Sequence, residues 1–352
     1  MNLETKVENY LRERFGPSSA PVKMEPLGKG LHGVAYRITF SAEGETKELI
    51  MKTLYPSRFG HDHYSDRAQV LLLANANYND MPKHVRAIDI VGDSESGLTS
   101  IKDAKEFYIF MEYARGEPYF SDLDKILKRG SLIPLDRKRT LMLASFIAQI
   151  HAYKYKGEDS GILYRRRIRD LVGHGECIMG IADTFNISEF GSSGDLEDYV
   201  AKCIPWWWAL HDKSERLSNV HGDFHPGNIR LEKDDFTLMD RSRGTWGEPA
   251  DDVSCLSINY LYYALKDCGR FEGPFAELFN LFWEDYIRNT GDDEMFEVVQ
   301  PFFAFRALVI SNPEFYPDES NLTRRKLFNF GYSVLGERRF NIGDIPDYLE
   351  RA

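Results

Sequence analysis

Polar and apolar residues follow two different periodicities in the first third of the chain. Residues 3–15 place apolar side chains three and four positions apart, which predicts an amphipathic helix. Residues 27–40 alternate between apolar and polar side chains and are followed by an apolar segment over residues 47–54, which together predict a β-hairpin. A further helix and two further strands are predicted over residues 66–76, 85–91 and 107–113. Residues 1–113 are therefore expected to form a small, strand-rich α+β unit.

The rest of the chain has mainly helical periodicity. Helices are predicted over residues 121–129 and 136–153 and through most of residues 253–351. One short exception lies at residues 220–240, where two apolar runs separated by polar residues predict strands. Residues 114–352 are therefore expected to form a second, mainly helical unit, and the expected fold class of the whole chain is α+β.

Length and composition fit a globular enzyme. The chain has 352 residues, of which 43% are hydrophobic and 28% are charged, and this length suggests about two domains. Its apolar stretches are far shorter than the ~18 residues that a membrane helix needs. The first residues carry charges where a signal peptide would need an apolar core. We therefore expect a cytoplasmic protein without a membrane partner.

The charge balance and the cysteines exclude some classes of ligand. Lys and Arg total 44 against 55 Asp and Glu, which gives a formal net charge of −11. Nucleic acid is not an expected partner because binding its phosphates needs a basic surface. A neutral or cationic small molecule meets no such objection. The four cysteines show no metal-ligand spacing, so they are interpreted as reduced and mostly buried thiols.

Four motifs carry candidate chemistry, and the first is a glycine-rich turn between two predicted strands. Gly28, Gly30 and Gly33 form a GxGxxG pattern. Glycines allow the backbone to lie against phosphate oxygens and to present its N–H groups to them. A dinucleotide-binding fingerprint would need a helix after the third glycine, whereas a strand is predicted here. A glycine-rich hairpin without a ligand is the alternative.

The second motif is a single lysine in an apolar strand. Lys52 follows the apolar run at residues 49–51. A lysine in a buried strand needs an anionic partner because removing an ammonium group from water is costly. A polyphosphate would be such a partner, and the alternative is an edge-strand lysine that points to solvent.

The third and fourth motifs combine acids with an amide. Asn228 follows Asp223 by five residues, with Pro and Gly between them to bend the loop. Such a loop can direct a carboxylate to an attacking hydroxyl while the amide oxygen binds a metal ion. Asp240 ends an apolar strand 12 residues after Asn228, so its carboxylate could share that metal. Asp252, at the end of the Gly247–Asp252 segment, is expected to support the loop. The alternative is a polar turn before a hairpin.

Together these motifs resemble the bilobal protein-kinase-like fold, and most closely the aminoglycoside phosphotransferase and choline kinase family. The resemblance covers nearly the whole chain. It rests on His221-Gly222-Asp223 with Asn228, on the strand-ending Asp240, and on the GxPxxD pattern of residues 247–252. The implied N-lobe, residues 1–113, binds the nucleotide, and the implied helical C-lobe carries the catalytic loop and the substrate site.

The resemblance implies roles in an ATP- and Mg²⁺-dependent transfer of phosphate to a hydroxyl group. Asp223 orients or deprotonates the acceptor hydroxyl, whereas Asn228 and Asp240 hold Mg²⁺. Lys52 holds the α- and β-phosphates, the three glycines cover the phosphates, and the backbone at the hinge meets adenine. The residues that the resemblance assigns to the nucleotide are Gly28, Gly30, Gly33, Lys52, Asp66, Glu112 and Ala114.

Two positions differ from the kinase pattern. A helix glutamate usually pairs with the strand lysine, but residues 55–80 contain no glutamate. Asp66 is the expected substitute, and Asp62 is the second choice. His225 stands two places after Asp223, where protein kinases carry a lysine, and its role stays open.

Two other functions remain as alternatives to the small-molecule kinase. The first is an atypical Ser/Thr protein kinase. Against it, the catalytic loop contains His-Gly-Asp instead of His-Arg-Asp, Asp240 is followed by Arg241-Ser242 instead of Phe-Gly, and no Ala-Pro-Glu segment follows. The second is a nucleotide-binding pseudokinase that acts as an interaction module. The pseudokinase is considered because the usual helix glutamate is missing. Against it, a non-catalytic binder does not need Asp223, Asn228 and Asp240 together.

The expected partner is a hydroxyl-bearing small molecule, and two features bear on its charge. Trp206–Trp208 could hold an alkylammonium group by cation–π attraction, although indoles that fill the core are the favoured interpretation. His174 and Glu176 are further candidate substrate contacts within a polar, glycine-flanked segment. Arg165–Arg169 could bind an anion, but a solvated helix face is favoured there.

Overall fold

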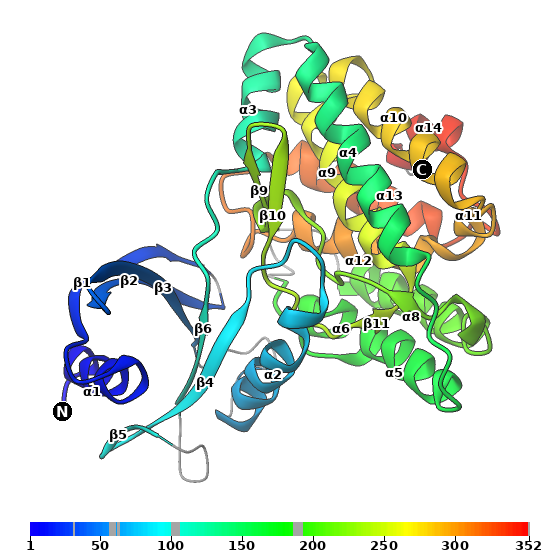
Figure 1. The fold of residues 1–352 in the computed structure, drawn as a ribbon. Helices are drawn as coiled ribbons and strands as arrows, with labels where there is room; N and C mark the ends of the chain where they lie inside the picture. The colour runs from blue at the N-terminus through cyan, green and yellow to red at the C-terminus, as the bar shows by residue number, and fades with distance from the viewer. Residues whose placement is uncertain (31, 56–60, 62–63, 100–105, 186–192, 351–352) are drawn as a thin grey trace. The chain divides into compact units, whose positions relative to one another are not determined.

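The computed structural model describes residues 1–352 except 31, 56–60, 62–63, 100–105, 186–192 and 351–352 (Figure 1). The chain forms two compact units. Unit 1 consists of Met1–Gly116 and a return segment, Asp235–Arg243, and unit 2 consists of Glu117–Asp234 and Gly244–Ala352. Unit 1 is rich in strands and unit 2 is mainly helical, which confirms the predicted α+β class. The sequence did not indicate the return segment, which carries Asp240.

Unit 1 is built on a six-stranded antiparallel sheet. Its strands lie in the order β1-β2-β3-β6-β4-β5, and each adjacent pair is antiparallel. The predicted hairpin and the predicted helix over residues 66–76 are both present, as β2–β3 and α2. The elements are α1 (Leu3–Phe15), β1 (Ala20–Lys29), β2 (Gly33–Ala42), β3 (Glu45–Leu54), α2 (Tyr64–Asn77), the 3₁₀ helix η1 (Tyr78–Asp80), β4 (Ala87–Ser94), β5 (Gly97–Thr99), β6 (Glu106–Met111) and, in the return segment, β10 (Asp235–Leu238).

Both faces of this sheet are apolar, and each is covered by one helix. Along β3, Leu49 and Met51 belong to one buried cluster with residues of α1, whereas Ile50 belongs to a second cluster with residues of α2. Successive side chains of a strand point to opposite faces, so the apolar run of residues 49–51 places buried side chains on both faces of the sheet. By the same alternation, Lys52 points to the face that α2 covers.

Unit 2 is an assembly of helices with short strands around one loop. Strand β7 pairs with β9, and β8 pairs with β11, both antiparallel. The elements are β7 (Glu117–Pro118), α3 (Tyr119–Arg129), α4 (Pro134–His151), α5 (Ser160–Gly173), α6 (Ile178–Ala182), α8 (Ser193–Ala209), η3 (Ser214–Arg216), β8 (Ser218–Asn219), η4 (Pro226–Asn228), β9 (Ile229–Glu232), β11 (Trp246–Gly247), α9 (Pro249–Cys268), α10 (Gly273–Thr290), α11 (Met295–Val298), α12 (Gln300–Ser311), α13 (Asn321–Val334), η5 (Ile342–Asp344) and α14 (Ile345–Leu349).

Helix α9 is the central helix of unit 2. Every residue from Pro249 to Leu265 is buried, which is typical of a helix surrounded by others. It packs against α10, α12 and α13, and Figure 1 shows it among these helices. Its first turn therefore provides a rigid position for polar side chains. Among the described residues, no helix is both long enough and apolar enough to cross a bilayer.

Candidate active site

The glycine-rich turn of unit 1 joins β1 to β2. The N–H of Gly30 donates to the carbonyl oxygen of Gly33 at 2.9 Å. A Cβ atom at Gly33 would lie 1.9 Å from the carbonyl oxygen of Thr53, so β3 leaves no room for a side chain there. A Cβ atom at Gly28 would meet nothing within 4 Å. Strand packing thus explains Gly33, whereas it does not explain Gly28.

Lys52 and Asp240 form an ion pair within unit 1. The Lys52 Nζ atom lies 2.7 Å from Asp240 Oδ2. β10 brings the aspartate there, because the N–H of Val85 donates to the carbonyl oxygen of Leu238 at 3.3 Å. Asp240 has a φ of 62°, a left-handed conformation that is uncommon and unfavourable for a residue with a side chain. Such strained residues cluster at functional sites, so this backbone conformation makes Asp240 a stronger candidate for a functional residue.

A further neighbour of Asp240 is Tyr78 in the 3₁₀ helix η1, which directly follows α2. Burial, the negative charge of Asp240 and a hydrogen bond to that carboxylate together raise the pKa of Tyr78 well above its usual value. The neutral tyrosine hydroxyl therefore donates to the carboxylate. Arg241 is fully buried and its Nη1 donates to the carbonyl oxygen of Asn77 at 3.3 Å, which fastens the next residue to the same helix end. No sequence motif indicated Tyr78.

The other candidate residues of unit 1 occupy the expected elements. Asp66 lies on α2, but its side chain, like the whole of Asp62, is outside the described part of the structure. The exposed Glu112 follows β6, and its N–H donates to the carbonyl oxygen of Arg86 at 3.1 Å. Ala114 packs against the apolar cluster that contains α2.

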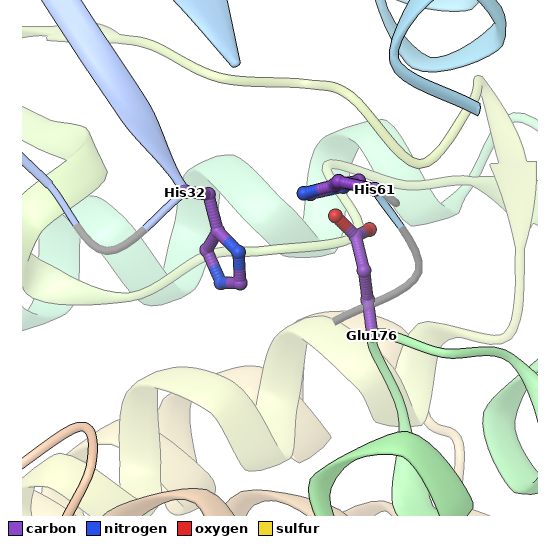
Figure 2. Close-up of side chains that lie close together, drawn as sticks. All are labelled: His32, His61 and Glu176. Atoms are coloured by element: carbon purple, nitrogen blue, oxygen red, sulfur yellow. The ribbon is translucent and has the colours of Figure 1, made fainter. Parts of the chain in front are cut away.

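Figure 2 shows two histidines of unit 1 that the sequence did not single out. The rings of His32 and His61 meet edge to face with centroids 5.3 Å apart. Glu176 is also drawn there but belongs to unit 2, where its backbone N–H donates to Nδ1 of His174 at 3.2 Å. His174 and Glu176, the two candidate substrate contacts of the 173–177 segment, thus lie in the same turn.

In unit 2, Asp223 and Asn228 meet inside the loop between β8 and β9. The Asn228 side-chain amide donates to the backbone oxygen of Asp223 at 3.0 Å and to its Oδ2 at 3.2 Å. His225 caps the short helix η4, since its Nδ1 accepts from the N–H of Gly227 at 2.9 Å. The buried Phe224 anchors the loop between the two polar residues. The amide nitrogen of Asn228 is thus used within the loop, and its oxygen is the atom suited to a cation.

Asp252 holds the backbone at the start of this loop. Its carboxylate accepts the N–H groups of His221 and Gly222, each at 2.7 Å. It also lies 3.1 Å from His151 Nε2, whose other ring nitrogen lies 2.8 Å from the hydroxyl of Tyr286. Burial alone would raise the pKa of Asp252, but the hydrogen bond and charge of His151, together with His221, hold it below the usual value. Asp252 supports the loop, as expected.

Arg306 on α12 binds Asp223 directly, and no sequence motif indicated this residue. Its Nη1 lies 2.6 Å from Asp223 Oδ1, and its Nη2 lies 2.6 Å from Asp251 Oδ1. The Cys255 Sγ atom is 3.8 Å from the same Asp223 oxygen. Burial raises the pKa of the Cys255 thiol well above its usual value, so it stays protonated. The available sequence signal was one arginine within the apolar run of residues 301–310.

The features proposed for substrate charge are only partly buried. Trp206 is half-buried and donates from Nε1 to the carbonyl oxygen of Leu335 at 2.9 Å, whereas Trp208 is 65% exposed. Core packing is therefore the wrong interpretation for Trp208. Arg165, Arg166 and Arg169 are exposed, in agreement with a solvated helix face. Arg167 differs, because it is partly buried with Nη2 3.8 Å from Asp251 Oδ2.

Comparisons with known proteins identify the fold. No family model and no curated protein matches this sequence. Among solved structures, amicoumacin kinase hAmiN, in complex with AMP-PNP, Ca²⁺ and Ami, is 14% identical with a TM-score of 0.55, covering 98% of this chain and 100% of its own. A putative fructosamine-3-kinase from Haemophilus somnus 129PT is 15% identical with a TM-score of 0.53, covering 96% and 100%. The predicted kinase-like fold with a strand-rich and a helical lobe is thus confirmed.

Proposed function

We propose that this protein transfers the γ-phosphate of ATP to a hydroxyl group of a small molecule. The observation that carries the proposal is the loop from His221 to Asn228. It holds the Asp223 carboxylate beside the Asn228 amide, and side chains from two helices fix its backbone. Phosphoryl transfer needs positioned groups more than covalent chemistry, so such a loop suits it.

In the proposed reaction, the acceptor hydroxyl oxygen attacks the γ-phosphorus of ATP. A bond forms between that oxygen and phosphorus while the bond from phosphorus to the β,γ-bridging oxygen breaks, and ADP leaves. The hydroxyl proton passes to Asp223. In a loose transition state this proton moves late, so Asp223 acts chiefly by orienting the hydroxyl and does not need to be a strong base.

The nucleotide assignments extend the same proposal. The glycine-rich turn and Lys52 would hold the phosphates, and Glu112 to Ala114 would meet adenine. Asn228 and Asp240 are the proposed Mg²⁺ ligands, since amide and carboxylate oxygens are donors that this ion prefers. When bound, the ion would neutralise phosphate charge. In the absence of nucleotide, Asp240 neutralises Lys52. Asp66 remains the proposed helix partner of this lysine.

The two solved structures support the substrate class. One is named a kinase of amicoumacin and is bound to an ATP analogue and a divalent cation, and the other is named a putative fructosamine-3-kinase. A small, hydroxyl-bearing acceptor is therefore the first class to test. Cationic and neutral acceptors both belong in the test, because the exposed Trp208 offers an aromatic surface to a cation. In this proposal the enzyme acts in the cytoplasm.

The test is ATP turnover with a panel of acceptors. Aminoglycosides, amino alcohols, sugars and one protein substrate are each incubated with ATP and Mg²⁺, and ADP and phosphorylated products are measured. The proposal predicts Mg²⁺-dependent transfer to at least one small molecule. Transfer to the protein alone would favour the protein kinase, and tight ATP binding without any transfer would favour the pseudokinase.

A further inference from the structure

Arg306 is a buried cation within the apolar run of residues 301–310 on helix α12. Helix α12 has the sequence QPFFAFRALVIS, and Arg306 is 6% exposed. A guanidinium group in such surroundings is stable only when carboxylates and hydrogen-bond acceptors surround it. Arg306 Nη1 binds Asp223 Oδ1, and its Nη2 binds Asp251 Oδ1 and, at 3.2 Å, the carbonyl oxygen of Gly222.

The planar guanidinium fixes these acceptors in direction as well as in distance. Its N–H groups lie in one plane at fixed angles, so a group bound to Nη1 and a group bound to Nη2 keep a fixed relation to each other. Asp251 lies in the first turn of the buried helix α9. Arg306 therefore links both the Asp223 carboxylate and the Gly222 backbone to the buried first turn of α9.

The two oxygens of Asp223 have different surroundings as a result. Oδ1 faces Arg306 at 2.6 Å and the Cys255 thiol at 3.8 Å. Oδ2 accepts from Asn228 at 3.2 Å and lies 3.8 Å from His225 Nε2. The Asp223 side chain keeps 21% of its surface exposed, against 9% for Asp251. The Asp251 carboxylate is thus nearly closed to solvent, whereas the Asp223 carboxylate remains partly open to it.

We propose that Arg306 is a positioning residue for phosphoryl transfer. It holds Asp223 Oδ1, so that Oδ2 is the oxygen presented to the acceptor hydroxyl. The inference rests on the proposed function. It also goes beyond the motifs, because Arg306 lies outside all of them and 83 residues from Asp223 along the chain. Arg306 touches neither nucleotide nor acceptor in this account and acts only through Asp223.

Arg216 shows that a buried arginine in unit 2 need not serve the loop. It is 4% exposed and bonds Glu248 at 2.8 Å, Asp292 at 2.8 Å and Glu294 at 3.0 Å. All three of these acidic residues lie outside the loop of residues 221–228. For Arg306, by contrast, two of the three acceptors lie within that loop. This difference favours a role in positioning Asp223 over a general role in holding the fold.

The test is a double-mutant cycle between Arg306→Met and Asp223→Ala. A matched control is Arg139→Met, since Arg139 also forms a largely buried ion pair, with Asp122, outside the loop. kcat and KM for ATP are measured with an acceptor from the panel, and Tm is measured for every variant. Arg306→Lys replaces Arg306→Met in the same cycle if the methionine variant does not fold.

We expect Arg306→Met to lower kcat by about a hundredfold, because a displacement of the order of 1 Å can cost that much. KM for ATP should stay within about twofold of the control. In the Asp223→Ala background, the same substitution should cause no further loss of kcat, since an effect that acts through a missing group disappears. Values of kcat like those of Arg139→Met, or an equal loss in both backgrounds, would overturn the inference.

The Tm values separate this inference from the proposed function. If the wild-type protein phosphorylates no acceptor, the proposed function fails, and the cycle is then decided on stability. Arg306→Met lowers Tm in the wild-type background and in the Asp223→Ala background, and the two shifts are compared. A shift that is smaller by about 2 °C or more in the Asp223→Ala background would show that Arg306 and Asp223 interact in solution. Equal Tm shifts in both backgrounds would refute it.

Discussion

Replacing Asp252 by asparagine tests how the loop of residues 221–228 is held. The carboxylate is fully buried and accepts two backbone N–H groups at 2.7 Å, while His151 Nε2 lies 3.1 Å from Oδ2. An asparagine has one oxygen, so its NH₂ group must face a backbone N–H. A lost hydrogen bond to a charged group and a buried N–H left without an acceptor together cost about 3–5 kcal/mol.

Urea unfolding of Asp252→Asn against the wild type measures this cost. Glu277→Gln is the control, because its ion pair with Arg137 at 2.6 Å is well exposed. We expect a large loss of stability for Asp252→Asn, and none beyond error for the control. The displaced loop should also lower kcat by about a hundredfold. A stability change below about 1 kcal/mol would refute the reasoning, since it would mean that the loop does not depend on this carboxylate.

The same variant has a defined pH dependence. Folding lowers the pKa of Asp252 below its ordinary value of 3.8, so its contribution to stability is fully present above that pH. It is lost as the pH falls through the lower pKa of the folded state. The stability difference between wild type and Asp252→Asn should therefore stay constant down to about pH 5 and shrink only below about pH 3.8. A difference that shrinks near neutral pH would contradict this assignment.

Three further predictions concern the two candidate pairs and the glycine-rich turn. Asp223→Asn should lower kcat by about two orders of magnitude or more while ATP still binds, which steady-state kinetics and calorimetry would show together. Asp240→Ala should abolish the Mg²⁺-dependent part of the ATP affinity in calorimetric titrations with and without the metal; an unchanged metal dependence would exclude Asp240 as a ligand. Gly33→Ala should cost about 1–3 kcal/mol, because its Cβ would lie 1.9 Å from a backbone oxygen, whereas Gly28→Ala should leave Tm nearly unchanged.

Local patterns along the chain were sufficient to predict the main elements and the loop. The contact between Asp223 and Asn228 spans five residues, and the Pro and Gly between them restrict the ways in which the loop can close. The apolar run of β3 and the periodicity of α4 are likewise local features. These parts of the structure follow from short-range preferences, so a single sequence contains the information.

The bounds of the edge strand β1, which precedes the glycine-rich turn, were not predicted, and this strand contains two prolines. Pro21 and Pro26 argue against a strand, since proline cannot donate to a neighbouring strand. In the structure β1 lies at the edge of the sheet, where this restriction is tolerated, and its pairing with β2 shifts register next to both prolines. Whether a strand lies at the edge or in the centre of a sheet is a property of the tertiary fold. The edge position is what allows this strand to contain two prolines.

Long-range partners of the site could not be predicted from the chain alone. Among the described residues, Lys52 pairs with Asp240, which lies 188 residues away along the chain, and no local pattern predicts this pair. Arg306 and Tyr78 were missed for the same reason, because nothing near them in sequence indicates an acidic neighbour. A lone polar group in an apolar helix shows only that it needs a partner. The packing of the helices determines which partner it has.

The most direct test of the account is a search for the phosphorylated product itself. A cellular metabolite extract is incubated with ATP, Mg²⁺ and either the wild-type protein or Asp223→Asn, and small molecules that gain one phosphate are identified by mass spectrometry. The account predicts at least one phosphorylated hydroxyl compound that forms with the wild type and not with the variant. Its formation at equal rates with both proteins, or its absence while both bind ATP, would contradict the account.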